Sequence, residues 1–309
     1  WVQLKGDIPT TQVYDMEIQK RENDLVLATF GRGFYILDNY TPLRELTPQL
    51  LEKEAYLFGV KDAIMFIPMG GRYGQGETYF KAKNPELGAT FTYYLKESIK
   101  TLKEKRKEEE KEAGKKGIDI RYPTMDELRV EDNEPEPYLL FTITDETGQV
   151  VRRMKTPAKS GVQRITWDLR FPSLRPTDLS EKKPSEEDED EDLYGGMLVM
   201  PGKYSVSLSK YVDGVTTPLA GPQSFQVIPL NNTTLPAQDR KAMAEFQGKV
   251  AELSRAVQGT VKVTQDLSER IKYIKAALNN TPAASPELIK QGEILENQVK
   301  EILRALSGD

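Results

Sequence analysis

The residues of this chain that could do chemistry are carboxylates, because two versatile catalytic side chains are absent. The sequence has 309 residues and contains neither Cys nor His. It therefore excludes a thiol nucleophile, a disulfide, a thiolate metal site and a Ser-His-Asp or Cys-His arrangement within the chain. It also disfavours a zinc site, since Zn²⁺ prefers Cys and His ligands. Paired carboxylates, which serve glycosidases, remain as candidates.

Asp15 and Glu17 are the clearest carboxylate pair. They lie two residues apart in a segment with the alternation of a β-strand, so both would be on one face of that strand. A pair at this spacing is common by chance, and the interpretation as two surface carboxylates is favoured. The sequence accordingly predicts no catalytic, cofactor-binding or metal-binding residue in this chain.

Two charged runs are further candidates for binding. Glu186–Asp192 is wholly acidic and could collect Ca²⁺ through its oxygens. It has neither the Asp-x-Asp-x-Asp-Gly pattern nor the glycine of an EF-hand, so a self-repelling, mobile loop is favoured. Lys100–Lys116 could bind phosphate or an acidic surface. Its lysines are interleaved with glutamates and no aromatic residue accompanies them, which favours a solvated helix.

The overall composition does not indicate binding to nucleic acid or to a membrane. There are 43 basic and 48 acidic side chains, for a net charge of -5, so no nucleic-acid partner is expected. No apolar run approaches the roughly 20 residues that span a bilayer. The glycines at positions 70, 71, 74 and 76 are not followed by Gly-Lys-Ser/Thr, so they indicate a flexible turn rather than a phosphate loop.

Three short strands near the N-terminus would position the carboxylate pair. Alternating or short apolar patterns predict strands over Val13–Ile18, Leu25–Thr29 and Phe34–Leu37, joined by tight turns. Three such antiparallel strands look like most of one β-propeller blade, which usually has four. A sheet this small is not expected to be stable alone.

Several stretches resemble one protein family. PTTQVYDMEIQKRENDLVLATFGRGFYILDNYTPLREL (Pro9 to Leu46) resembles the closing blade of bacterial sortilin-like β-propeller proteins, which are also described as BNR-repeat or glycosyl-hydrolase-like. NPELGATFTYYLKE (Asn84 to Glu97) is similar to the segment that follows in that family. EPYLLFTITDETGQVVRRMKTPAKSGVQRITWDLRFPS (Glu136 to Ser173) and PGKYSVSLSKYVDGVTTPLAGPQSFQV (Pro201 to Val227) also resemble it. The propeller repeat Ser-x-Asp-x-Gly-x-Thr is absent, as expected of a piece that holds only the propeller's tail.

The resemblance implies an extracytoplasmic bacterial protein, periplasmic, cell-surface or secreted, whose propeller binds peptide or glycan ligands. It implies that the remaining blades, from the same gene product or a second chain, pack against residues 13–37. Arg32 and Asp38 could then line the propeller channel, although turn residues are the favoured interpretation. Because the chain starts with Trp1 and has neither a start methionine nor a signal peptide, we expect it to begin within a domain.

After a connector over residues 47–88, the period-2 pattern returns and predicts an immunoglobulin-like β-sandwich over residues 89–230. Trp167 lies within one of its strands and is expected in the core. Charged insertions at residues 96–135 and 172–200 interrupt the sandwich. The candidate strands are Ala89–Leu95, Tyr138–Thr144, Gln149–Lys155, Val162–Leu169, Gly202–Ser209, Val215–Leu219 and Gln223–Ile228.

Residues 236–307 are predicted to form an antiparallel helical hairpin. Asn279–Pro282 would end the first helix, and Ser285 would cap a second helix that Pro286 begins. The first helix is longer than the second, so part of its apolar stripe needs another cover and is the expected site of a protein partner. The stripe has 3–4 spacing and comprises Phe246, Val250, Leu253, Val257, Leu267, Ile271, Ile274 and Leu278.

The sequence thus predicts a mainly β fold with added helices: a closing propeller blade over residues 1–46, the connector, the sandwich and the hairpin. The function it favours is a non-catalytic C-terminal scaffold and interaction module of a sortilin-like propeller protein. The alternative is the accessory C-terminal part of a secreted, sialidase-like glycoside hydrolase. That alternative requires a buried carboxylate pair and a sugar-sized cleft in the other blades. No cofactor is expected in either case.

Overall fold

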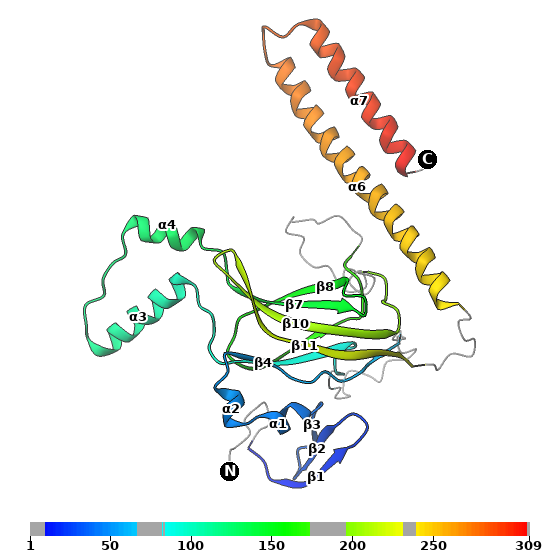
Figure 1. The fold of residues 1–309 in the computed structure, drawn as a ribbon. Helices are drawn as coiled ribbons and strands as arrows, with labels where there is room; N and C mark the ends of the chain where they lie inside the picture. Colours follow the sequence, from blue (N-terminus) through cyan, green and yellow to red (C-terminus); the bar gives the residue numbers. More distant parts are fainter. Residues whose placement is uncertain (1–9, 67–81, 83, 174–195, 231–238, 308–309) are drawn as a thin grey trace. The chain divides into compact units, whose positions relative to one another are not determined.

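The computed structural model describes residues 10–66, 82, 84–173, 196–230 and 239–307 (Figure 1). It contains both β-sheets and α-helices, which confirms the predicted class of β structure with added helices. The chain divides into two units, one of residues 1–169 with 201–232 and one of residues 170–200 with 233–309. The three sheets belong to the first unit, and the two longest helices belong to the second.

The N-terminal part of the first unit is an antiparallel sheet with the strand order β1-β2-β3. Asn23, with a φ of 58°, lies in the turn between β1 and β2, and Gly31 and Gly33, both with a φ of 74°, lie in the turn between β2 and β3. Left-handed backbone suits Asn and Gly, so these residues fix where the strands reverse. The bounds are β1 Val13–Gln19, β2 Asp24–Thr29 and β3 Phe34–Leu37, followed by the short helices α1 Thr41–Glu45 and α2 Pro48–Leu51.

Two further sheets pack face to face and hold the core of the first unit (Figure 1). One has the strand order β5-β11-β10-β7-β8, and the other has the order β4-β6-β9. Neighbouring strands pair antiparallel, except that β5 runs parallel to β11. The bounds are β4 Ala55–Leu57, β5 Ala63–Met65, β6 Ala89–Leu95, β7 Tyr138–Asp145, β8 Val150–Pro157, β9 Gly161–Trp167, β10 Gly202–Val212 and β11 Val215–Pro229.

Aromatic side chains from both sheets meet between them. The ring of Phe91 on β6 lies 6.2 Å from Phe141 on β7 and 5.6 Å from Phe225 on β11, measured between ring centroids. Trp167 on β9 lies 5.6 Å from Tyr204 on β10. All five side chains are buried, and Trp167, the last residue of β9, is only 1% exposed, so it lies in the core as predicted. Large rings that interlock across two sheets bury much apolar area, which is the main stabilising term here.

The stretch 47–88, predicted as a connector, supplies two of these strands. β4 pairs with β6, and β5 pairs with β11. Leu57 and Phe58 are buried, so this stretch also contributes to the core. Gly88 leads into β6 with a φ of 131°, and an added Cβ there would lie 1.9 Å from the carbonyl oxygen of Trp167. Only glycine fits at this position.

One strand prediction is wrong. The sequence predicts separate strands over Val215–Leu219 and Gln223–Ile228, whereas the single strand β11 covers both and pairs with β10. Pro222 cannot donate a hydrogen bond to a neighbouring strand, so it marks a break in the sequence pattern. In the structure the pairing register shifts between Val206 and Ser209, and the ladder continues past the irregularity.

The insertion at residues 96–135 contains two helices without a single buried residue, α3 (Leu102–Lys116) and α4 (Met125–Asn133). Each begins with a capping box, in which a threonine side chain and a glutamate three residues later exchange hydrogen bonds with the backbone. Gly117 ends α3 with a φ of 65°. Local signals therefore define these helices, since no packed core supports them.

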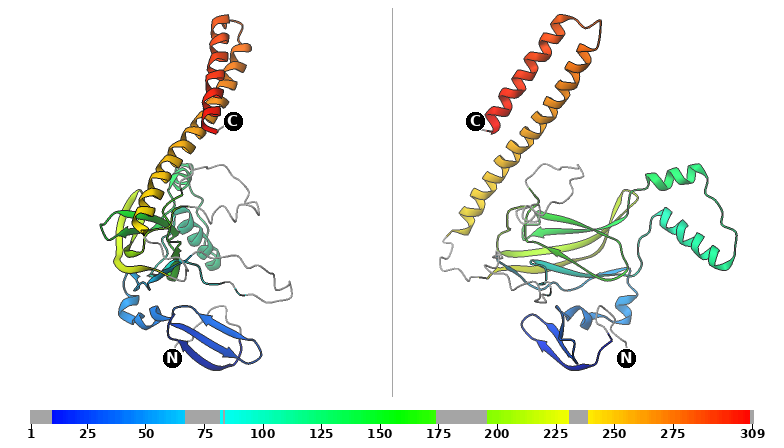
Figure 2. Two further views of the ribbon diagram at one scale, coloured as in Figure 1. Left: turned by 90° about the vertical axis from the view of Figure 1, so that its right-hand side faces the viewer. Right: turned by 180° about the vertical axis from the view of Figure 1, so that it is seen from behind.

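The second unit contains α6 (Arg240–Asn279) and α7 (Pro286–Ser307), which lie side by side and antiparallel (Figures 1 and 2). Their 40 and 22 residues correspond to lengths of about 60 and 33 Å. Ile271 on α6 and Val299 on α7 are buried at their contact, and Lys275 forms an ion pair with Glu296 across it. Because this pairing brings the C-terminal end of α7 close to the middle of α6, the N-terminal half of α6 extends beyond α7.

Candidate interaction surfaces

The carboxylate pair of β1 is a surface feature. Asp15 and Glu17 share one face of the strand, and both residues are exposed. The Asp15 carboxylate accepts a hydrogen bond of 2.8 Å from the backbone N–H of Met16. A glycosidase acid works in a site that excludes water, whereas these two side chains face solvent.

Arg32 and Asp38 lie at opposite ends of β3, so the structure does not bring them together. Asp38 is partly buried, and burial together with the charge of Asp24 raises the pKa of its carboxyl, while the charge of Arg164 on β9 acts in the opposite direction. The Arg164 guanidinium donates hydrogen bonds of 2.6 Å and 2.9 Å to the carbonyl oxygens of Asp38 and Asn39. The end of β3 is thereby tied to β9, which is an anchoring role for this segment.

Two other predicted features lie outside the described residues, the glycines at positions 70, 71, 74 and 76 and the acidic run Glu186–Asp192. Within the described part of the chain, no group of three or more acidic side chains is placed to hold a metal ion. Among the same residues, no helix is both long and apolar enough to cross a membrane.

The N-terminal sheet is the first candidate interaction surface. None of the residues in β1, β2 and β3 is buried. The strand register places Met16, Leu27 and Tyr35 side by side on one face of the sheet, and Val26 and Ile36 on the other. An antiparallel sheet ordinarily has one apolar face that is covered and one polar face in solvent, so this sheet departs from the usual pattern.

Exposed apolar side chains occur on both faces of the N-terminal sheet. Met16 is 61% exposed on one face, and Ile36 and Phe34 are 60% and 75% exposed on the other. Tyr14 and Phe30 stack on each other near one end of the sheet and remain 72% and 69% exposed. Such a concentration of uncovered apolar groups makes this sheet a candidate surface for contact with another polypeptide.

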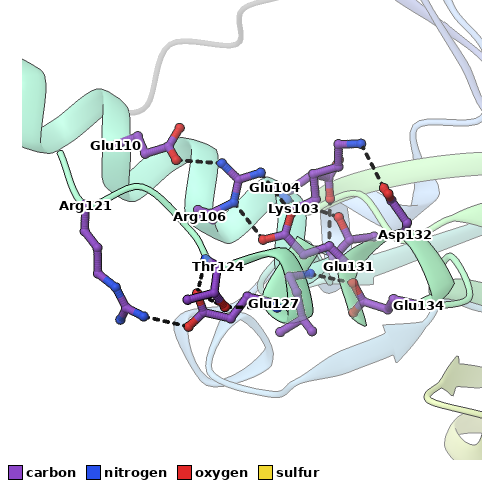
Figure 3. A network of polar contacts seen from close by, with 12 residues as sticks. Lys103, Glu104, Arg106, Glu110, Arg121, Thr124, Glu127, Glu131, Asp132 and Glu134 are labelled. Carbon is purple, nitrogen blue, oxygen red and sulfur yellow. Dashed lines mark hydrogen bonds and ion pairs between the residues drawn. The ribbon is translucent and has the colours of Figure 1, made fainter. Parts of the chain in front are cut away.

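The α3–α4 insertion is the second candidate surface, and ion pairs hold it together (Figure 3). The Arg106 guanidinium on α3 donates two hydrogen bonds of 2.7 Å and 2.8 Å to the two carboxylate oxygens of Glu131 on α4. It also donates one of 2.6 Å to Glu110. These bonds lower the pKa of the Glu131 carboxyl and raise the pKa of Arg106. A two-point contact of this kind fixes geometry better than a single surface ion pair.

A groove of about 670 Å³ runs between α3 and α4. Its apolar lining includes Leu102, Ile120 and Val130, and charged side chains surround them. Tyr122, in the loop before α4, is 89% exposed, and Met125, the first residue of α4, is 68% exposed. The sequence analysis missed this surface, although apolar residues at 118, 120 and 122 stand out within a highly charged insertion.

The helical hairpin is the third candidate surface. Met243, Phe246, Val250 and Leu253 lie on the part of α6 that extends beyond α7, and they are 49%, 66%, 48% and 66% exposed. The expectation of surplus apolar surface on the long helix therefore agrees with the exposure of these side chains.

No family model matches this chain, and no curated protein matches it.

Proposed function

We propose that this chain is a non-catalytic scaffold and interaction module, and that its N-terminal sheet is the closing blade of a sortilin-like β-propeller. The observation that carries the proposal is the exposure of both faces of the β1–β2–β3 sheet. A propeller blade is covered on both faces by its neighbours, so two apolar faces are what an isolated blade would display. The resemblance of residues 9–46 to such a blade supports the same assignment.

In this proposal the remaining blades, from the same gene product or a second chain, cover residues 13–37. A fourth strand would pair with a free edge of the three-stranded sheet, since the described residues include no strand beyond β1 or β3. The two packed sheets behind it would be an immunoglobulin-like sandwich that supports the blade. Arg164 on β9 already anchors the end of the blade to this support.

The wider protein would be an extracytoplasmic bacterial protein that binds peptide or glycan ligands through its propeller. A glycoside hydrolase is the alternative, and no feature of the described residues favours it over binding. Asp15 and Glu17, its clearest carboxylate pair, are exposed on β1. We therefore assign this chain a structural and binding role.

The test is to replace two exposed residues of the blade, Phe34→Ser with Ile36→Ser. Because both side chains face solvent, the double variant should keep the unfolding free energy of the chain within about 1 kcal/mol of the original. It should weaken binding to the remaining blades at least about tenfold, whereas Tyr122→Ser, on the α3–α4 loop, should leave binding unchanged.

Two results contradict the proposal. If Phe34→Ser with Ile36→Ser unfolds the chain by itself, these side chains are covered within the chain and the surface is not an interface. If the chain alone hydrolyses aryl glycosides or sialosides, and Asp15→Asn or Glu17→Gln abolishes the turnover, the non-catalytic assignment is wrong.

A further inference from the structure

The helical hairpin of α6 and α7 leaves one side of its own contact uncovered. Five apolar side chains next to the contact remain about half exposed. They are Leu267 (43%), Ile274 (54%), Leu288 (48%), Leu295 (51%) and Ile302 (47%). We call this set the open seam.

The five residues of the open seam lie on the same side of the hairpin. Successive residues of a helix are about 100° apart, so a residue that precedes a contact residue lies beside the contact. Ile274 precedes Lys275 and Leu295 precedes Glu296, and those two charged residues are joined across the contact. Two antiparallel helices are exchanged by a two-fold axis that is perpendicular to the plane containing both helix axes. Such a rotation leaves a side chain on the same side of that plane. Residues that directly precede a contact residue, on α6 or on α7, therefore lie on one common side of the hairpin.

The two sides of the hairpin differ in charge. Residues that follow a buried contact residue lie on the side away from the open seam, and Lys272, Glu293 and Lys300, which follow Ile271, Gly292 and Val299, are all charged. Residues three or four positions apart are neighbours on a helix surface, so the residues three positions after or four positions before each member of the open seam form its border. These bordering residues are Val263, Arg270, Ala277, Gln291, Gln298 and Ala305, and only Arg270 among them is charged. The uncovered side is therefore apolar at its centre and nearly neutral at its rim.

We propose that the open seam binds the open seam of a second copy of this chain, so that two hairpins form a four-helix bundle. In such a bundle each helix buries residues toward two neighbours, and the open seam supplies the missing second contact. A two-fold interface joins a patch to itself, which a neutral rim permits and a strongly charged rim would oppose. The amides of Gln291 and Gln298 both donate and accept hydrogen bonds, so they can pair across such an axis.

The size of the open side is sufficient for a stable dimer. The paired part of the hairpin is about 24 Å long on α6 (residues 264–279) and about 33 Å long on α7, and it is two helices, about 20 Å, wide. Its footprint is therefore about 480 to 660 Å² on each copy, or about 1,000 to 1,300 Å² in total. A specific protein interface buries at least about 1,000 Å² in total.

The N-terminal half of α6 is a weaker candidate for self-association. Its charged residues are Arg240, Lys241, Glu245, Lys249, Glu252 and Arg255. Four of these six are basic, so two copies of this segment would repel each other. The proposal therefore places the dimer contact on residues 264–307, and it is independent of the role proposed for the N-terminal sheet.

The experiment compares two adjacent and exposed residues of α6 by sedimentation velocity on the full chain. Ile274→Glu puts a charge in the open seam, whereas Tyr273→Glu puts the same charge one position away, outside it; Tyr273 is 71% exposed. The original chain should be dimeric at about 10 μM, Ile274→Glu should raise the dissociation constant at least about tenfold, and Tyr273→Glu should behave like the original. Circular dichroism should show unchanged helix content in both variants.

A second measurement uses the absence of cysteine from the chain. Leu295→Cys, near the middle of α7, should form a disulfide-linked dimer on mild oxidation, and Tyr273→Cys should not. The proposal is overturned if the original chain is monomeric at about 100 μM, where even weak specific dimers form. It is also overturned if Ile274→Glu and Tyr273→Glu change the dissociation constant equally, or if Tyr273→Cys cross-links as readily as Leu295→Cys.

Discussion

Glu296 on α7 shows how single residues bind the two helices of the hairpin to each other. Hydrogen bonds from Lys275 on α6 and from Lys300 lower the pKa of its carboxyl from 4.5 to about 2. The folded state therefore holds the proton less tightly than the unfolded chain. The stabilisation is complete above about pH 4.5, the unfolded value, and is lost as the pH falls toward 2.

We predict that the hairpin loses thermal stability between about pH 4.5 and pH 2, and that part of this loss disappears in Glu296→Gln because the titrating group is gone. Thermal melts followed by circular dichroism at 222 nm across this pH range measure the effect. Glu301→Gln is the control, because Glu301 is an exposed carboxylate of the same helix without an ion pair among the described residues. Equal pH profiles for the original and Glu296→Gln would contradict the account.

Ile271 is the apolar residue on which the hairpin most depends, because it is 8% exposed at the centre of the helix contact. We predict that Ile271→Asp lowers the unfolding free energy of the hairpin by about 2–4 kcal/mol, since it buries an unpaired charge. Tyr273→Asp, at a side chain that is 71% exposed, should cost less than about 1 kcal/mol. Urea titrations of both variants measure the two changes in unfolding free energy. Similar losses in Ile271→Asp and Tyr273→Asp would mean that the contact with α7 is assigned to the wrong face of α6.

At the scale of elements, α3 and α4 depend on Arg106 rather than on a core, because neither helix has a buried residue. We predict that Arg106→Gln increases amide exchange in α4 while the two packed sheets keep their protection, since the guanidinium makes the two-point contact with Glu131. The contacts that would remain are the ion pair of Lys103 with Asp132 and the hydrogen bond from the backbone N–H of Leu102 to Glu134. Lys107→Gln, a neighbour with no ion pair among the described residues, should change neither the exchange of α4 nor that of the sheets. Unchanged amide exchange of α4 in Arg106→Gln would show that other contacts are sufficient to hold α3 and α4 together.

The sequence predicts local elements well where the pattern is regular. The predicted strand Ala89–Leu95 coincides with β6, and the predicted stop at Asn279 coincides with the end of α6. Both rest on short-range signals, the period of a strand and the chemistry of a helix end. The continuity of β11 is not predictable in this way, because the register shift opposite Pro222 depends on how β10 pairs with it.

Surfaces are harder to predict than elements, because exposure depends on what packs against a segment. The sequence pattern of an apolar stripe is the same whether another segment packs against the stripe or the stripe is exposed to solvent. Leu267 and Ile271 belong to the same predicted stripe, yet one is 43% exposed and the other is 8% exposed. Only the position of α7 separates them, because Ile271 lies at the helix contact and Leu267 lies beside it.

At the scale of the whole molecule, the contacts that stabilise the fold belong to separate regions of the chain. The aromatic core between the packed sheets and the contact between α6 and α7 are separate, and the chain consists of two units. One melting temperature therefore does not describe it, because two-state unfolding holds for single cooperative domains. The N-terminal sheet adds a third region with no buried residue in its strands. Its stability has to be measured separately from that of the two sheets behind it.

The most direct test of the interaction role is therefore hydrogen exchange of the chain, resolved by strand. We predict that amides of β1, β2 and β3 exchange through openings whose free energy lies at least about 2 kcal/mol below that of β6 and β7, because no side chain of the N-terminal sheet is buried. Supplying the remaining blades should raise their protection and leave β6 and β7 unchanged. Protection of β1–β3 equal to that of β6 and β7 in the chain alone would contradict the account, since such a sheet would need no partner.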